Sequence, residues 1–166
     1  MPSGTTTRQP RLDPSDVDAY INRGNSYNDL GEPKRAIRDY DDAIRLAPSD
    51  VDAYINRGNS YNNLGEYKRA IQDYDEAIRL DPKEAAAYAN RGSNYRELGE
   101  HRRAIQDLDT SIQLNPNDPL TYANRALTYA YLGLDAETRQ DVEIAVALGL
   151  DRGPLEDKIS EILDQP

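Results

Sequence analysis

The chain repeats itself with a period of 34 residues, and this period constrains its fold more than any other feature of the sequence. Residues 17–50 read VDAYINRGNSYNDLGEPKRAIRDYDDAIRLAPSD, and residues 51–84 differ from them at only seven positions. A looser third copy occupies 85–118, and a degenerate fourth copy occupies 119–152. Such a repeat predicts structural units that stack on their neighbours around one continuous core.

Each copy divides at a glycine into two helical patterns. In the first pattern of copy one, Tyr20, Gly24 and Tyr27 fall on a single helical face. A glycine fits the left-handed position just after a helix, and the four turns contain Gly31, Gly65, Gly99 and Gly133. A proline ends the second pattern of the first three copies, at Pro48, Pro82 and Pro116. The sequence therefore predicts an all-α fold of four helical hairpins.

The tyrosines are expected to fill most of the space between these helices. The chain has 12 Tyr but no Trp and no Phe, so Tyr carries the aromatic burial. A buried tyrosine hydroxyl without a hydrogen-bond partner is costly. We therefore expect most of these hydroxyls to reach solvent or a polar partner.

The two ends of the chain differ from the repeats. Residues 1–14 are rich in Thr, Pro, Ser and Gly without apolar periodicity, which predicts a disordered leader before a repeat array at 15–152. At the other end, residues 153–164 place Leu155, Ile159 and Ile162 at helical spacing. This segment is predicted to form a helix that caps the last copy. Docking of the same helix onto a second chain is the alternative.

The composition argues against several classes of function. The chain has no Cys and one His, His101, which excludes thiolate chemistry and multi-histidine metal sites. The net charge of −10 argues against a nucleic-acid partner and mildly favours basic partners. No apolar run of membrane-span length and no signal-peptide pattern is visible, which favours a cytoplasmic location.

No arrangement of residues suggests catalysis, so we expect a non-enzymatic protein without a cofactor or metal. Acidic clusters such as Asp39, Asp41 and Asp42 lie on one helix, where neighbouring carboxylates point in different directions and are expected to be solvated. His101 stands where the other copies have Pro33, Tyr67 and Asp135, and it is expected to be a surface residue without a specific role.

These patterns together resemble the tetratricopeptide repeat. The motif is Tyr-x2-Arg-Gly-x2-Tyr, then Ala-x3-Tyr and Pro, and the resemblance covers residues 17–152. It implies an α-solenoid of four helix-turn-helix repeats in a right-handed superhelix, closed by the C-terminal capping helix. Two departures are visible. An Arg replaces the usual Leu before the Gly, and copy four has Thr138, Val142 and Leu150 in place of Ala, Tyr and Pro.

The recurrent arginine is expected to form an ion pair. It sits at the margin of the tyrosine stripe, as Arg23, Arg57, Arg91 and Arg125. An aspartate recurs at one position of the second helix, as Asp39, Asp73, Asp107 and Asp141. We expect each Arg to bridge to the Asp of its own or a neighbouring copy and thereby to orient the helices. Contact of the Arg with a ligand is the alternative.

An asparagine precedes this arginine in all four copies, as Asn22, Asn56, Asn90 and Asn124. Each points away from the core of its hairpin, although Asn is a poor helix former. In the tetratricopeptide family the first helices line a concave groove, and an asparagine here grips the backbone of an extended peptide in some members. The resemblance therefore implies a protein-interaction module with a ladder of asparagines, which both donate and accept hydrogen bonds. Shared ancestry of the copies is the alternative explanation.

Neighbouring positions are expected to tune what this groove binds. Copies one and two add Asn25 and Asn59, copy three adds Arg96, and copy four places Leu127 and Tyr131 on the open face. The apolar face of copy four is expected to be a pocket for a ligand side chain, or a surface covered by the C-terminal helix or a second chain.

Two further functions are weighed on the same residues. Some family members clamp the acidic C-terminus of a chaperone with basic residues, but Ile21, Ala86 and Asn90 stand at those positions, which argues against this function. The alternative to peptide binding is a scaffold that oligomerises through its ends or its C-terminal helix.

Overall fold

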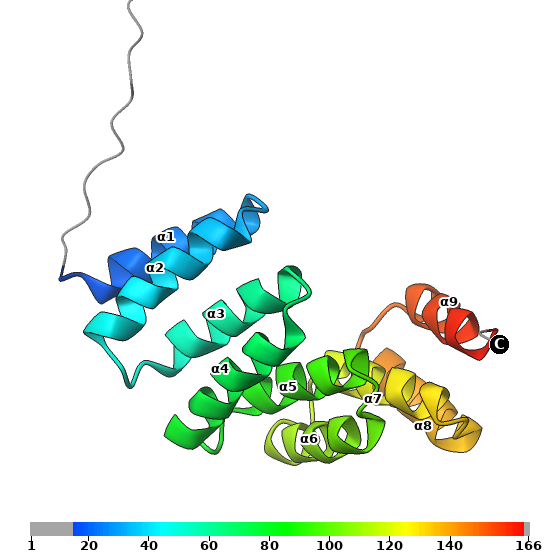
Figure 1. Cartoon of the computed structure of the whole chain (residues 1–166). Coiled ribbons are helices and arrows are strands. Elements are labelled where there is room, and N and C mark those ends of the chain that lie inside the picture. Colours follow the sequence, from blue (N-terminus) through cyan, green and yellow to red (C-terminus); the bar gives the residue numbers. More distant parts are fainter. Residues whose placement is uncertain (1–14, 165–166) are drawn as a thin grey trace, which may run out of the picture.

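The computed structural model describes residues 15–164. Within that range the regular structure is entirely α-helical (Figure 1). The helices are α1 (Val17–Asp29), α2 (Pro33–Leu46), α3 (Val51–Asn63), α4 (Tyr67–Leu80), α5 (Ala85–Glu97), α6 (His101–Leu114), α7 (Pro119–Tyr131), α8 (Asp135–Ala147) and α9 (Arg152–Leu163). The leader predicted at 1–14 lies outside the described residues.

The helices form four hairpins that stack in chain order. Each first helix packs against the second helix of its copy, and that helix packs against the first helix of the next copy. The first helices also contact one another in the order α1, α3, α5, α7 (Figure 1). The prediction of an all-α array of helical hairpins is confirmed, whereas the handedness of its superhelix stays a prediction.

The first helix of each copy has a distinct start and stop. An acidic side chain accepts a hydrogen bond from the first turn, at Asp16, Asp50, Glu84 and Asp118. The helix ends before a glycine with φ between 68° and 75°, at Gly31, Gly65, Gly99 and Gly133. This left-handed conformation strongly favours glycine, which is why the same residue marks every turn.

A second glycine allows the two helices of a hairpin to approach closely. In copy two, a Cβ atom on Gly58 would lie only 2.7 Å from Cε1 of Tyr74, whose side chain is buried. Gly24 meets Tyr40 in the same way in copy one. The tyrosine ring therefore packs directly on the backbone of the first helix, and a glycine is required there.

The predicted arginine–aspartate pairs are present in all four copies. In copy two, Nε and Nη2 of Arg57 donate to the two carboxylate oxygens of Asp73 at 2.9 and 2.6 Å. Nη1 of Arg57 donates to Asp41 of the preceding copy at 2.7 Å. One guanidinium thus joins α3 to α4 and to α2. Arg91 and Arg125 make the equivalent three bonds, and Arg23 makes the two within its own copy.

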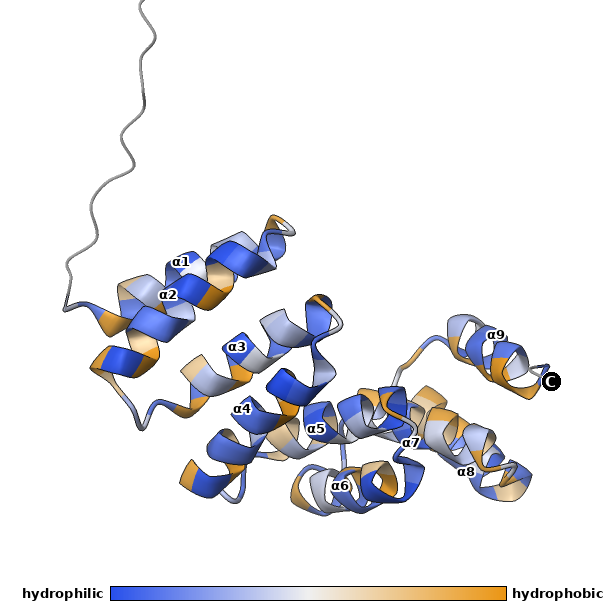
Figure 2. Ribbon diagram, in the orientation of Figure 1, coloured by the Kyte–Doolittle hydropathy of each residue, from blue (hydrophilic) through white to orange (hydrophobic). Residues whose placement is uncertain are grey.

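Copy four and α9 share the most apolar part of the core. Leu127 of α7 is buried together with Leu155 and Ile159 of α9. Figure 2 shows apolar positions on α7, α8 and α9, whereas α1 to α4 are mostly polar on their visible surfaces. The C-terminal helix therefore covers Leu127 on the apolar face of copy four, whereas Leu120 and Tyr131 stay exposed.

We predict that Gly58→Ala destabilises the fold by about 1–3 kcal/mol, because the added methyl group overlaps a buried ring. This loss outweighs the gain of up to about 1 kcal/mol in helix propensity. Urea unfolding followed by circular dichroism measures the effect. Gly153→Ala in α9 is the control, since its nearest neighbour would lie at 3.8 Å, and it should be neutral or stabilising. Equal effects of the two changes would contradict the packing argument.

A second prediction separates the two carboxylates that Arg57 bridges. Asp73→Ala should destabilise the chain by about 1.5–3 kcal/mol, because it removes charge-assisted bonds from a side chain that is 7% exposed. Asp41→Ala should cost less than about 1 kcal/mol, because Asp41 is 52% exposed and solvent screens its pair. Urea unfolding of both variants provides the comparison. A larger effect at Asp41 would show that the bridge between copies matters more than the pair within the hairpin.

Candidate functional site

The four first helices bring the predicted asparagines to one surface. Because α1, α3, α5 and α7 contact one another in order, their equivalent residues form a row across the array. Asn22 is exposed, and the other three are partly exposed, at Asn56, Asn90 and Asn124. We call the side of these helices that carries the row the asparagine face.

The four amides of the row differ in how many hydrogen bonds they already make. The side chains of Asn22 and Asn56 make none among the described residues. Nδ2 of Asn90 donates to Oδ1 of Asn59 at 3.0 Å. Oδ1 of Asn124 accepts from Nη1 of Arg96 at 3.1 Å. Asn90 therefore still offers its acceptor and Asn124 its donor, so every member of the row keeps a polar group available for a ligand.

Asn25 and Asn59 also have a structural role, which was not predicted. The hydroxyl of Tyr40 donates to Oδ1 of Asn25 at 2.6 Å, and that of Tyr74 donates to Oδ1 of Asn59 at 2.8 Å. Burial raises the pKa of Tyr40 to about 12, so this hydroxyl stays protonated at neutral pH. The two asparagines therefore satisfy the buried hydroxyls.

A comparison of the four copies with one another reveals a signal for the pairing of tyrosine with asparagine. Copies three and four have Leu108 and Val142 in place of the second-helix tyrosine, and Ser93 and Leu127 in place of the asparagine. Both partners are absent together. A comparison of equivalent positions along the chain would thus have predicted the hydrogen bond.

Six further tyrosine hydroxyls also have polar partners, as expected. Those of Tyr27, Tyr61 and Tyr95 accept from Arg35, Arg69 and Arg103 at 2.6–2.7 Å, and each guanidinium lies 4.0 Å from the ring centroid. Those of Tyr54, Tyr88 and Tyr122 donate to the carbonyls of Pro48, Pro82 and Pro116 at 3.2–3.4 Å.

The expectation for His101 was wrong. This residue is partly buried and stacks on Tyr131, with ring centroids 5.0 Å apart and planes inclined by 10°. Its Nδ1 atom is buried and makes no hydrogen bond among residues 15–164. Burial, and secondarily the positive charge of Arg96, lower the pKa of His101. The histidine instead supports the ring of Tyr131, which is 43% exposed at the edge of the asparagine face.

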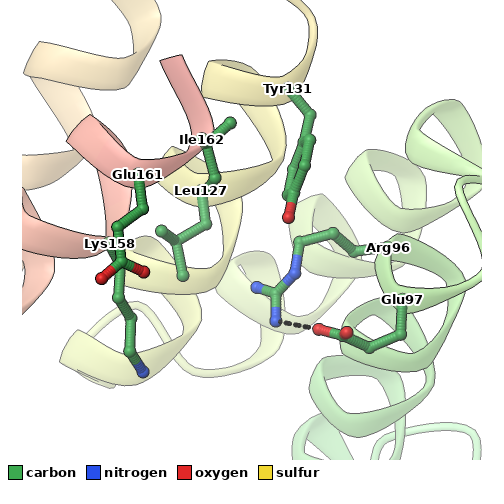
Figure 3. Close-up of a pocket in the computed structure, with 7 residues that line it drawn as sticks. All are labelled: Arg96, Glu97, Leu127, Tyr131, Lys158, Glu161 and Ile162. Carbon is green, nitrogen blue, oxygen red and sulfur yellow. Dashed lines mark hydrogen bonds and ion pairs between the residues drawn. The ribbon is translucent and has the colours of Figure 1, made fainter. Parts of the chain in front are cut away.

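Two cavities flank Leu127 where α9 meets copy four. The first holds about 250 Å³ and is lined by Arg96, Glu97, Leu127, Tyr131, Lys158, Glu161 and Ile162 (Figure 3). The second holds about 300 Å³ and is lined by Leu120, Ala123, Asn124, Leu127, Leu150, Asp151, Pro154, Leu155 and Lys158. The predicted residues Arg96, Leu127 and Tyr131 therefore do meet at one cavity. The contribution of α9 residues such as Lys158 to the cavity lining was not predicted, because it depends on where this helix folds against copy four.

The described part of the chain offers no sign of a metal site or membrane span. No group of three or more His, Asp or Glu side chains suited to a metal ion occurs among residues 15–164. None of the helices in that range is long and apolar enough to cross a membrane.

Sequence comparison agrees with this architecture. Residues 17–50 and 51–84 each match the family described as tetratricopeptide repeat, and residues 92–133 match a family described as TPR repeat. The chain belongs to the tetratricopeptide repeat family. No curated protein matches it.

Several solved structures resemble this tetratricopeptide repeat protein. The crystal structure of MamA is 28% identical, with 90% of this chain and 83% of that chain covered and a TM-score of 0.74. The second TPR domain of human RPAP3 was solved by NMR in complex with the HSP70 peptide SGPTIEEVD. It is 26% identical, with 68% of this chain and 98% of that chain covered and a TM-score of 0.64. TTC0263, a thermophilic TPR protein of Thermus thermophilus, is 20% identical over 89% of this chain and 81% of that chain, with a TM-score of 0.77, and shows the fold alone.

We predict a pH dependence of stability that is specific to His101. Its pKa in the folded chain is lowered, so the unfolded chain binds the proton more readily. The stabilisation is present above the unfolded pKa of about 6.5 and is lost as the pH falls through the folded pKa. Thermal melts at pH 8 and pH 5 should show a larger loss for wild type than for His101→Gln. Equal losses of thermal stability in the two proteins would show that folding does not lower the pKa of His101.

Proposed function

We propose that this chain is a non-enzymatic protein-interaction module that binds an extended peptide along the asparagine face. The observation that carries the proposal is the row formed by Asn22, Asn56, Asn90 and Asn124, in which each amide keeps an unused donor or acceptor. An extended peptide presents backbone N–H and C=O groups at regular intervals, and carboxamides bind both kinds. The same proposal includes a cytoplasmic location and the division of the chain into a leader at 1–14, an array at 15–152 and a capping helix at 153–164.

The resemblance to RPAP3 supports binding of a peptide as a class. The second TPR domain of RPAP3 was solved in complex with an HSP70 peptide. This chain has Ile21, Ala86 and Asn90 where a carboxylate-clamping member of the family has basic residues. An acidic C-terminus would therefore meet few cations here, and the proposed ligand is a segment held through its backbone.

A self-assembling scaffold is the second candidate, favoured by apolar exposure near the C-terminal end of the array. Leu132, Leu134 and Leu163 are 40%, 37% and 55% exposed. Association through this end would bury them against another copy. Light scattering across a concentration series tests this candidate, because a chain that stays monomeric at high concentration does not assemble.

We predict that a variant with Ala at all four row positions loses peptide binding. Peptides selected from a random display library on wild type should bind it at least about 30-fold more weakly, because four hydrogen bonds are lost and each contributes about 0.5–1.5 kcal/mol. Calorimetric titration measures the affinity. The variant should remain folded, since Ala is the better helix former.

The matched control changes four amides on the second helices, by Ala at Gln72, Gln106, Gln113 and Gln140, all of which are exposed. This variant should bind the selected peptides as wild type does. Retained binding by the asparagine variant, or equal losses in both variants, would place the ligand elsewhere.

A further inference from the structure

One line of residues along the asparagine face changes its chemistry from one end to the other. These residues lie four positions before each asparagine of the row, so each occupies the same side of its helix one turn earlier. In chain order they are Asp18, Asp52, Ala86 and Leu120. We call them the first-turn line. It begins with two carboxylates, passes a small residue and ends with a large apolar one.

The two carboxylates of the first-turn line have no partner among residues 15–164. Asp18 and Asp52 are exposed, and neither side chain makes a hydrogen bond or ion pair among the described residues. Helix initiation does not depend on them, because Asp16 and Asp50 already cap α1 and α3. The equivalent α5 and α7 form with no acidic residue in the first turn. These carboxylates are therefore available to a cation on a ligand.

The other end of the first-turn line opens into the second cavity beside α9. Leu120 is 60% exposed and lines this cavity of about 300 Å³. Five further apolar residues line it, Ala123, Leu127, Leu150, Pro154 and Leu155, together with the charged Asp151 and Lys158. Asn124, the last member of the asparagine row, lines the same cavity. A peptide backbone held by this amide would have an apolar cavity directly beside it.

An extended backbone places successive side chains on opposite sides, so alternate residues of a bound peptide face the first-turn line. We infer that the preferred ligand is an extended segment with lysine or arginine where it crosses copies one and two and an aliphatic residue where it crosses copy four. This inference rests on the proposed function. It adds to it the order of side chains that the peptide presents.

A residue swap taken from the chain itself tests the aliphatic end. Leu120→Asp gives copy four the residue of copies one and two, at an exposed position in a first helical turn, where a carboxylate is tolerated. Random peptides displayed on phage are selected separately on wild type and on this variant. Wild type should enrich an aliphatic residue at one end of the peptide, and L120D should enrich Lys or Arg at that place.

The affinities of the selected peptides should follow the same preference. Peptides selected on wild type should bind L120D roughly tenfold more weakly, because they lose the burial of one aliphatic side chain. Leu30→Asp is the control, since Leu30 is 70% exposed in the α1–α2 turn outside the first-turn line, and it should leave the affinity unchanged. Circular dichroism melts establish that each variant is folded.

The acidic end is tested by the double change of Asp18 and Asp52 to Asn. Peptides with basic residues should bind this variant roughly two- to tenfold more weakly at low salt, and the difference should shrink at high salt. The control removes the same number of charges, by Asn at Asp135 and Asp157, which are exposed on α8 and α9. Equal losses in both variants would show an effect of net charge alone and overturn the inference.

The outcomes separate this inference from the proposed function. If no peptide is enriched on wild type, the proposed function fails and the inference fails with it. If the enriched peptides require the asparagine row but show no basic-to-aliphatic order, the proposed function stands and the inference is overturned. Light scattering that finds a wild-type dimer and a monomeric L120D would overturn it in favour of a second copy of the chain at Leu120.

Discussion

The bridge made by each arginine is the interaction on which the rest of the array depends. Arg57 binds Asp73 across its own hairpin and Asp41 across the junction with copy one. The neighbouring Gly58 lets the Tyr74 ring rest on the helix backbone. Two adjacent residues thus fix both the spacing of the hairpin and its orientation on the preceding one. Repetition of this pair extends the same geometry along the chain.

The fold could be predicted because each rule that decides it is local and repeated. The glycine turns, the proline stops and the tyrosine stripe agree in several copies, so an error at one position is corrected by its equivalents. The arginine–aspartate pairs were predictable for the same reason. His101 was misjudged because its partner Tyr131 belongs to the next copy and neither residue recurs. The covering of Leu127 depends on where α9 folds back, which no helical period encodes.

The site was only partly predictable, because one asparagine can serve the core and the surface together. The sequence placed Asn25 and Asn59 on the open face but did not reveal that their oxygens bind Tyr40 and Tyr74. Their role is to accept the hydrogen bonds of two buried tyrosine hydroxyls. Oδ1 of Asn59 also accepts from Nδ2 of Asn90, so the packing of this hairpin is physically coupled to the asparagine row.

Near-identical copies create a problem of register that the end of the array resolves. Copies one and two present the same amides and the same Asp18 and Asp52, so a peptide held only there could shift by one copy at little cost. Copy four removes this degeneracy, because no other copy has a leucine at the position of Leu120 and, among the described helices, α9 contacts only α7 and α8. A side chain seated there would set the position of every other residue of the ligand. In the proposed complex, specificity comes from the one copy that departs from the repeat, while the regular copies supply affinity through the backbone.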